Sequence, residues 1–215
     1  MAEQGDLRAL RREYQAEALL EADVARDPID QFERWFEQAL TLQPDNANAM
    51  VLATASADGC PSARVVLLKH FDSEGFCWYT DYRSQKGQEL SENPQAELLF
   101  YWPELERQVR IWGPVARLDH AAAEHYFAAR PRGSQISASV SRQSAVVAGR
   151  EDLVAAAMTL EEQYQHQSIP CPADWGGYQL RPERMEFWQG RENRLHDRLV
   201  YGRQLQGWQL VRLAP

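Results

Sequence analysis

Residues 49–80 read AMVLATASADGCPSARVVLLKHFDSEGFCWYT. Short apolar runs, partly β-branched, alternate here with turn signals; in order these are 49–56, Ala57-Asp58-Gly59, 62–70, 72–75 and 76–80. Asp-Gly between two such runs is a strong hairpin signal, and Gly beside Asp or Ser marks a turn. The stretch therefore predicts three consecutive antiparallel strands.

Outside this stretch, further short runs and helical patterns alternate. Strands are expected at 96–102, 108–118, 177–180, 184–188, 194–201 and 207–213, and helices at 30–42, 84–92, 119–129 and 150–164. The segment 7–25 is charged and helix-friendly, although its apolar face is weak. Short strands at this spacing, mixed with helices, predict the α+β class: an antiparallel sheet or barrel with helices packed around it.

Composition narrows the function classes. The chain has 215 residues, a hydrophobic fraction of 44% and a net charge of -8, which argues against general nucleic-acid binding. No run is long enough to span a membrane, and the charged N-terminus lacks a signal-peptide core. Cys60, Cys77 and Cys171 show no metal-ligand spacing, so no metal is expected. A soluble cytoplasmic protein is expected.

The segment Arg191–Arg198 concentrates positive charge. If it is a strand, Arg194, His196 and Arg198 lie on one face, with Trp188 in the same parity. Three potentially cationic groups side by side would be relieved by an anion, and Trp188 suits an aromatic ligand. The alternative is a solvated outer face on which Glu192 and Asp197 are the local partners.

Two cations flank the apolar run Val65–Leu68. Arg64 and Lys69 could hold a long anionic ligand by its two ends. Residues five apart point to opposite faces of a regular strand, so one ligand can touch both only at a bulge, a strand end or a wrapped path. The alternative is a core strand with charged ends.

Two further groups could bind anions. Tyr126 and Arg130 lie four apart on one helix face and precede Ser134, which suits a phosphate clamp, although an arginine at a helix C-terminus also complements the dipole. Lys86 falls in the first turn of the helix near Ser84, where an anion is favourable. No hydrolase, zinc-protease or nucleotide-loop motif is present. The pattern fits an enzyme whose cofactor performs the chemistry.

At these residues the chain resembles the pyridoxine (pyridoxamine) 5'-phosphate oxidases. Residues 185–198, MEFWQGRENRLHDR, look like that family's signature, and similarity extends nearly end to end. The resemblance implies a split-barrel FMN-binding fold and a homodimer with FMN at the subunit interface. It implies an N-terminal arm over residues 1–26 that acts as a lid, and one FMN-binding domain over 27–215.

The implied reaction is the oxidation of pyridoxamine or pyridoxine 5'-phosphate to pyridoxal 5'-phosphate. A hydride would move from C4' of the substrate to flavin N5, and dioxygen would then be reduced to hydrogen peroxide. The residues implied for FMN are Arg64, Val65, Val66, Leu67, Leu68, Lys69, Tyr79, Thr80, Gln85, Lys86, Gln108, Gln143, Ser144, Trp188 and Arg198. Those implied for the substrate are Arg11, Arg12, Glu13, Tyr14, Lys69, Tyr126, Arg130, Ser134, Arg194, Leu195 and His196, of which Arg194 and His196 would be catalytic.

One position departs from the family. Ser84-Gln85-Lys86 stands where the family usually has Ser-Arg-Lys, so position 85 gives no charge to the FMN phosphate. Arg64 and Lys86 still would, and Arg83 next door is a candidate for compensation. Two other functions stay open: a different flavin enzyme on the same barrel, and a non-catalytic binder of flavin or pyridoxal phosphate.

Overall fold

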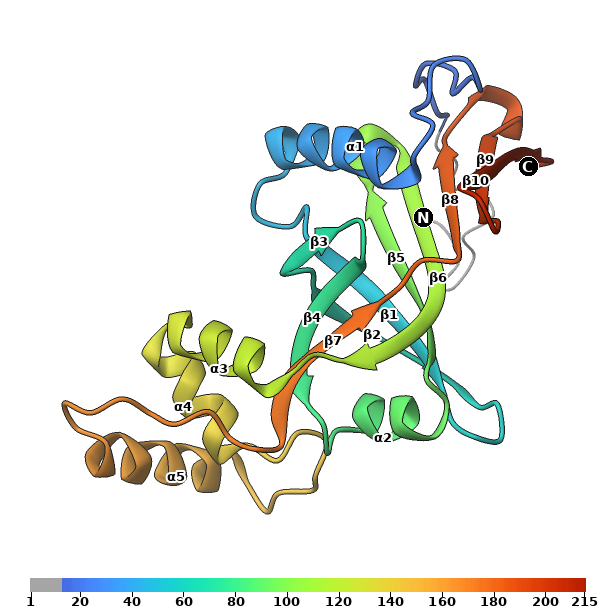
Figure 1. Cartoon of the computed structure of the whole chain (residues 1–215). Coiled ribbons are helices and arrows are strands. Elements are labelled where there is room, and N and C mark those ends of the chain that lie inside the picture. The colour runs from blue at the N-terminus through green and yellow to red at the C-terminus, as the bar shows by residue number, and fades with distance from the viewer. Residues whose placement is uncertain (1–12) are drawn as a thin grey trace, which may run out of the picture. The chain divides into compact units, whose positions relative to one another are not determined.

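The computed structural model describes residues 13–215, and its elements follow one another as short strands interrupted by helices (Figure 1). The helices are α1 (Pro28–Leu42), α2 (Gln85–Glu92), α3 (His120–Ala129), α4 (Arg132–Val140) and α5 (Arg150–Gln163), with short 3-10 turns η1 (Pro103–Leu105) and η2 (Glu192–Arg194). The strands are β1 (Ala49–Ala55), β2 (Pro61–Leu67), β3 (His70–Asp72), β4 (Gly75–Asp81), β5 (Gln95–Trp102), β6 (Arg107–Arg117), β7 (Trp175–Leu180), β8 (Arg184–Gln189), β9 (Asp197–Arg203) and β10 (Trp208–Leu213). The predicted α+β class is confirmed.

The chain forms two compact units, and the strands β5 and β6 contribute to both. Of the described residues, the first unit comprises 13–47, Leu99–Ile111 and Arg184–Pro215, and the second comprises Asn48–Leu98 and Trp112–Glu183. The division expected from the sequence, an arm over 1–26 and one domain over 27–215, stays a prediction. Across residues 13–215, none of the helices combines the length and apolar character needed to cross a membrane.

The first unit packs α1 against antiparallel strands. β8 pairs with β9 and β9 with β10, and Trp188 lies opposite Arg198 in this register. The helix begins after Asp27, whose side chain caps the N–H of Ile29. Its Phe32 ring lies 5.1 Å from that of Phe100, and further aromatic contacts join α1 to β8. This apolar stripe fixes the helix on the sheet.

The second unit joins the hairpin β1–β2 to the antiparallel set β3–β4–β7. The predicted turn at Ala57-Asp58-Gly59 is present, and Gly59 takes the positive φ of 84° that glycine allows there. Helices α3, α4 and α5 lie together beside the ends of β4 and β7 (Figure 1). Phe127, Ile136 and Trp175 form the buried centre of that cluster.

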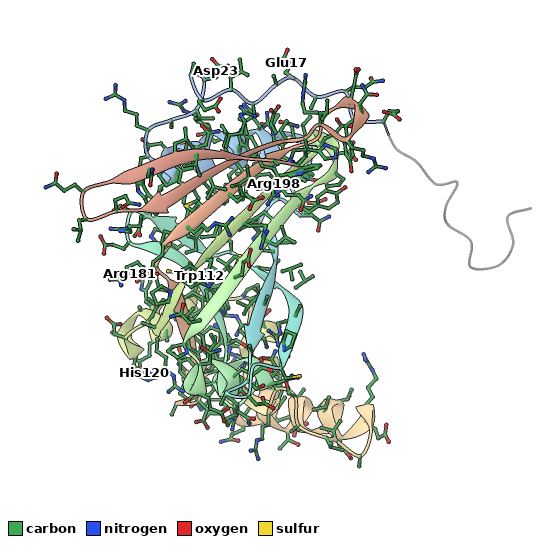
Figure 2. The ribbon with its side chains drawn as sticks, turned by 90° about the vertical axis from the view of Figure 1, so that its right-hand side faces the viewer. Glu17, Asp23, Trp112, His120, Arg181 and Arg198 are labelled. Carbon is green, nitrogen blue, oxygen red and sulfur yellow. The ribbon has the colours of Figure 1, made fainter. Side chains whose placement is uncertain are left out.

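Two expectations about local structure are wrong. The strand expected from residue 194 begins only at Asp197, because Asn193 and Arg194 adopt positive φ in η2. The strand expected over 62–70 divides into β2 and β3. The helix-friendly segment 7–25 forms no helix in its described part, where Glu17 and Asp23 lie on an irregular stretch along the β8–β10 strands (Figure 2).

Candidate active site

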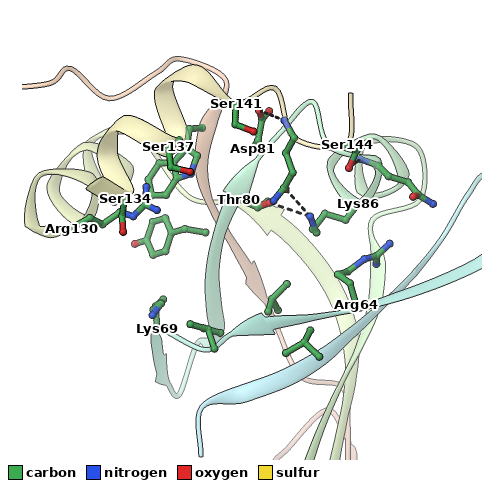
Figure 3. A pocket seen from close by; sticks show the side chains of 18 of the residues that line it. Arg64, Lys69, Thr80, Asp81, Lys86, Arg130, Ser134, Ser137, Ser141 and Ser144 are labelled. Atoms are coloured by element: carbon green, nitrogen blue, oxygen red, sulfur yellow. Dashed lines mark hydrogen bonds between the residues drawn. The ribbon is translucent and has the colours of Figure 1, made fainter. Parts of the chain in front are cut away.

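A cavity of about 800 Å³ lies within the second unit. Its walls come from β2, β4, the first turn of α2, the end of α3, α4, the segment after α4, and Trp175 (Figure 3). Residues predicted from the sequence supply most of the lining: Arg64, Val65, Val66, Leu67, Lys69, Tyr79, Thr80, Gln85, Lys86, Tyr126, Arg130, Ser134, Gln143 and Ser144. Leu68 is instead buried in the core, and Gln108 belongs to the first unit.

The end of β2 explains how Arg64 and Lys69 both reach one cavity. β2 ends at Leu67 and β3 begins at His70, so the two cations do not lie on one regular strand. Between them Leu68 turns into the core, and the N–H of Lys69 donates to the carbonyl of Cys77 at 2.9 Å. One ligand could touch both Arg64 and Lys69 only at a bulge, a strand end or a wrapped path, and the structure has a strand end between them.

At one end of the cavity, the guanidinium of Arg64 is held by protein groups. Its Nη1 donates to the carbonyl of Leu52 at 3.1 Å, and its Nη2 lies 3.2 Å from Oε2 of Glu89. Glu89 also accepts hydrogen bonds from Thr54 and Ser62. Arg64 is thus oriented before any ligand binds.

Glu89 is a buried carboxylate that the sequence did not single out. Burial alone would raise its pKa, but hydrogen bonds from Ser62, Thr54 and Gln85 and the charge of Arg64 outweigh burial and lower the pKa to about 2. Glu89 is therefore ionised at neutral pH. Its four partners come from two strands and one helix, and no local spacing in the sequence reveals such a group.

Lys86 is buried, and no carboxylate of the described residues accepts a hydrogen bond from its ammonium. Only 7% of the residue is exposed, and in the described part of the chain its Nζ contacts are neutral: Gln143 Oε1 at 2.7 Å, Thr80 Oγ1 at 3.4 Å and Ser84 Oγ at 3.5 Å. Burial, followed by the charge of Arg64, lowers the pKa of Lys86. An anionic ligand would offset the cost of this buried charge.

Position 85 supplies no charge to this end. Gln85 is exposed, and its Nε2 donates to Glu89 Oε1 at 2.8 Å, while its backbone N–H donates to Ser144 Oγ at 3.2 Å. The suggested compensation by Arg83 is not supported by its contacts, since its guanidinium lies 2.8 Å from Asp81 and 3.2 Å from Asp174.

The other end of the cavity carries a second cation, Arg130. Its Cζ lies 4.7 Å from the ring centroid of Trp175, and burial lowers its pKa. Its Nη1 is buried and has no hydrogen-bond partner among the described residues. Buried donors are normally satisfied, so this orphan atom marks a place for an acceptor such as a phosphate oxygen.

An aromatic wall stands beside Arg130. The ring of Tyr126 stacks on that of Tyr79 with centroids 4.0 Å apart, and Tyr79 stacks in turn on Trp175 at 5.5 Å. Tyr126, Lys69 and Ser134 line the same cavity. The predicted phosphate-clamp residues are therefore brought together in one cavity. The sequence analysis missed Trp175, because it follows an irregular loop and no periodic pattern links it to Tyr126 or Arg130.

The signature segment lies in the first unit. His196 packs against Trp188 with ring centroids 4.7 Å apart, and its Nδ1 accepts a hydrogen bond from the N–H of Arg191 at 3.0 Å. Since a backbone N–H can only donate, the ring proton of neutral His196 is on Nε2. Burial, and then the charge of Arg194, lower the pKa of His196, so the ring is neutral at pH 7.

The common strand face expected for Arg194, His196 and Arg198 is not formed. Arg194 belongs to η2, and the exposed Leu195 and the half-buried His196 precede β9. Arg198 is in β9, with its Nε 2.8 Å from Oε1 of Glu186. Arg198 is therefore paired with a carboxylate, but its partner is the buried Glu186 and not Glu192 or Asp197, which the solvated-face alternative named.

The described part of the N-terminal arm docks within the first unit. Tyr14 makes edge contacts with Trp188 and His196, with centroids 5.6 and 5.3 Å away. Glu106 Oε2 accepts from the N–H groups of Gln15 and Ala16 at 2.8 and 3.0 Å. Glu13 is exposed, while Arg11 and Arg12 lie outside the described residues.

Comparisons with solved structures define the class of fold. A pyridoxamine 5'-phosphate oxidase-related FMN-binding protein of Nostoc punctiforme matches with a TM-score of 0.70 over 86% of this chain and 97% of that one, at 19% identity. PhzG of Burkholderia lata, solved with tetrahydrophenazine-1-carboxylic acid, matches with a TM-score of 0.87 over 93% and 99%, at 33% identity. The chain has the α+β split-barrel fold, as predicted.

The sequence comparisons give the family. Residues 36–167 match the family described as pyridoxamine 5'-phosphate oxidase, and residues 175–215 match the pyridoxine 5'-phosphate oxidase C-terminal dimerisation region. The chain belongs to the pyridoxamine 5'-phosphate oxidase family. It is 54% identical to the pyridoxine/pyridoxamine 5'-phosphate oxidase of Rubrobacter xylanophilus, over 98% of this chain and 97% of that one. It is 52% identical to a chloroplastic oxidase of Arabidopsis thaliana, over 98% of this chain and 41% of the relative.

Proposed function

We propose that this chain oxidises pyridoxamine 5'-phosphate and pyridoxine 5'-phosphate to pyridoxal 5'-phosphate, with FMN as cofactor and dioxygen as the electron acceptor. Relatives about half identical over nearly the whole chain carry the corresponding name. The observation that carries the proposal is a cavity with a buried cation at each end: the contacts of Lys86 with the described residues are neutral, and Arg130 has a nitrogen without a partner among them.

The residues present fit FMN. Its phosphate suits the end of the cavity where Lys86 lacks an anionic partner among the described residues and where Arg64 is already oriented. When bound, FMN supplies the ring that accepts a hydride and passes electrons to dioxygen. The residues proposed to hold it are Arg64, Val65, Val66, Leu67, Leu68, Lys69, Tyr79, Thr80, Gln85, Lys86, Gln108, Gln143, Ser144, Trp188 and Arg198.

The substrate phosphate suits the opposite end. Arg130 offers an unpaired Nη1, and Lys69, Tyr126 and Ser134 line the same cavity. A phosphate clamp remote from the reacting carbon supplies binding energy that fixes the substrate's orientation. This end argues against a flavin enzyme for unphosphorylated substrates, because such substrates would leave Arg130 unsatisfied.

Arg194, Leu195 and His196 are proposed to meet the pyridine ring of the substrate. His196 is neutral, with its proton on Nε2, and so suits a hydrogen bond that orients the ring better than it suits an obligatory base. Arg194 is proposed to lie near C4' of the substrate. The arm residues Arg11, Arg12, Glu13 and Tyr14 are proposed to cover the bound substrate.

A homodimer with FMN at the subunit interface completes the proposal. The match of residues 175–215 to a dimerisation region supports a dimer. The association state is open to measurement by light scattering with and without FMN, and a monomer that binds FMN at full affinity would contradict the interface site.

The test is the visible spectrum of the purified, FMN-loaded protein under anaerobic conditions. Pyridoxine 5'-phosphate should bleach the flavin band, and air should restore it. Unphosphorylated pyridoxine at the same concentration is the control and should bleach it far more slowly. A flavin band that neither phosphorylated vitamer bleaches would refute the oxidase, and would favour a protein that binds flavin without turning over these substrates.

A further inference from the structure

Helix α4 and its C-cap residue Ser141 bring serine side chains to the cavity. Ser134, Ser137 and Ser141 all line it, whereas Ser139 does not (Figure 3). We infer that Ser137 is a further ligand of the substrate phosphate, acting beside Ser134. The inference rests on the proposed function and adds to it a residue that determines affinity for the phosphate.

The spacing places the two hydroxyls together. Residues three apart on an α-helix are neighbours, with Cβ atoms about 5–6 Å apart. Ser134 and Ser137 therefore share one face of α4 (Arg132–Val140). The helix itself is anchored, because Ile136 is buried against Phe127 and Trp175 in the aromatic cluster. One phosphate group has several acceptor oxygens and can take hydrogen bonds from both hydroxyls.

The hydroxyl of Ser137 is available to a ligand. A serine inside a helix commonly returns its hydroxyl to the carbonyl four residues earlier. Ser139 does so, donating to the carbonyl of Gln135 at 2.9 Å. Within the described part of the chain, neither Ser134 nor Ser137 makes a side-chain hydrogen bond to protein. The two serines on the cavity face are thus the ones left without a protein acceptor.

The cations and hydrogen-bond donors at the Arg130 end of the cavity suit one phosphate group, which has several acceptor oxygens. Arg130 Nη1 is also without a partner among the described residues, and Lys69 adds a second cation to the lining. Asp81 is the acidic residue of the lining, and its carboxylate already accepts from Arg83 and from the N–H of Gln143. A phosphate would accept from Arg130, Ser134 and Ser137 at once.

The experiment compares Ser137→Ala with Ser139→Ala in the FMN-loaded protein. Ser139 is the matched control, since it lies on the same helix and its hydroxyl is satisfied by backbone. Dissociation constants are measured for pyridoxal 5'-phosphate, for inorganic phosphate and for pyridoxal. One hydrogen bond to a charged group predicts that Ser137→Ala weakens binding of the two phosphate ligands about 10- to 150-fold. The affinities for pyridoxal, which has no phosphate, and for FMN should stay within about twofold of wild type.

A second variant gives an independent readout. Ser137→Asp places a like charge against the phosphate and should weaken pyridoxal 5'-phosphate more than Ser137→Ala does, while FMN affinity reports that the fold is intact. With pyridoxine 5'-phosphate as substrate, Ser137→Ala should raise KM and leave kcat nearly unchanged.

The outcomes separate two failures. Wild-type protein that neither binds pyridoxal 5'-phosphate nor oxidises pyridoxine 5'-phosphate would refute the proposed function and this inference with it. Wild-type protein that does both, with Ser137→Ala and Ser137→Asp binding phosphate ligands as tightly as wild type, would overturn the inference alone. Equal losses for pyridoxal and pyridoxal 5'-phosphate would also overturn it, because the contact would then not be to the phosphate.

Discussion

Replacing Gln85 with arginine should tighten FMN binding about fivefold. Gln85 lines the end of the cavity proposed for the FMN phosphate, together with Arg64 and Lys86, and its side chain donates to Glu89 at 2.8 Å. An arginine at this position would reach the same carboxylate and the same end of the cavity. It would add one charge to an end whose Arg64 is already partly neutralised by Glu89.

The size of the expected gain in FMN affinity depends on how exposed position 85 is and on how far Glu89 competes for the new guanidinium. A hydrogen bond to a charged group contributes about 1.5–3 kcal/mol when well formed. Position 85 is exposed, and Glu89 would compete with the phosphate for the new guanidinium, so about 1 kcal/mol is expected, which is about fivefold in Kd. An arginine in the first turn of α2 also opposes the helix dipole until an anion binds, which favours the bound state further.

The assay is a fluorescence titration of the FMN-free protein with FMN, for wild type and Gln85→Arg, at about 50 mM and about 500 mM salt. The gain should shrink at high salt, since the Debye length falls from about 10 Å at 0.1 M to about 3 Å at 1 M. Ser91→Arg is the control, because Ser91 is exposed on the same helix and does not line the cavity. Equal affinities at low salt would refute the reasoning, and an equal gain in Ser91→Arg would assign the effect to net charge.

Other changes have defined outcomes. Because the folded pKa of Glu89 is about 2, its ionised form stabilises the protein above about pH 4.5, and that stability is lost as the pH falls toward 2. The free energy of unfolding of Glu89→Gln, measured with urea, should therefore change less with pH across this window than that of wild type. Parallel pH profiles for the two proteins would contradict the paired carboxylate. Arg194→Ala should lower turnover more than flavin content, whereas equal losses would make the residue structural. His196→Ala should weaken substrate binding, and unchanged affinity would count against an orienting role. Glu106→Ala should speed amide exchange at Gln15 and Ala16 about fivefold, for about 1 kcal/mol of lost hydrogen bonding; unchanged exchange would show that other contacts hold the arm.

Local sequence patterns predicted most of the helices and strands, because turns and helix caps depend on residues that are neighbours in the sequence. The Asp-Gly turn gave the β1–β2 hairpin, and Asp119 caps α3 by accepting from the N–H of Ala122. Helix α4 was missed, since Pro131 reads as a stop and Gly133 weakens the first turn. Its stability comes from Ile136 in a cluster of residues distant in sequence, which local propensity does not contain.

The candidate site was predicted residue by residue, but not as an arrangement. Composition and spacing placed cations at 64, 69, 86 and 130, and the family resemblance assigned them to two phosphates. The break after β2, which lets Arg64 and Lys69 face one cavity, depends on Leu68 entering the core. The turn at Asn193 and Arg194 likewise needs positive φ at non-glycine residues, which no alternation pattern indicates.

The arrangement of charge connects stability with ligand binding. Arg64 and Arg83 are paired with internal carboxylates, so they are satisfied before a ligand arrives. Lys86 has only neutral contacts in the described part of the chain, and Arg130 has an orphan nitrogen, so each is a buried donor that costs folding free energy. Anions that bind only the folded protein remove this cost and stabilise it by mass action. The two residues that make the ligand-free protein less stable are therefore the ones proposed to select for two phosphates, one at each end of the cavity.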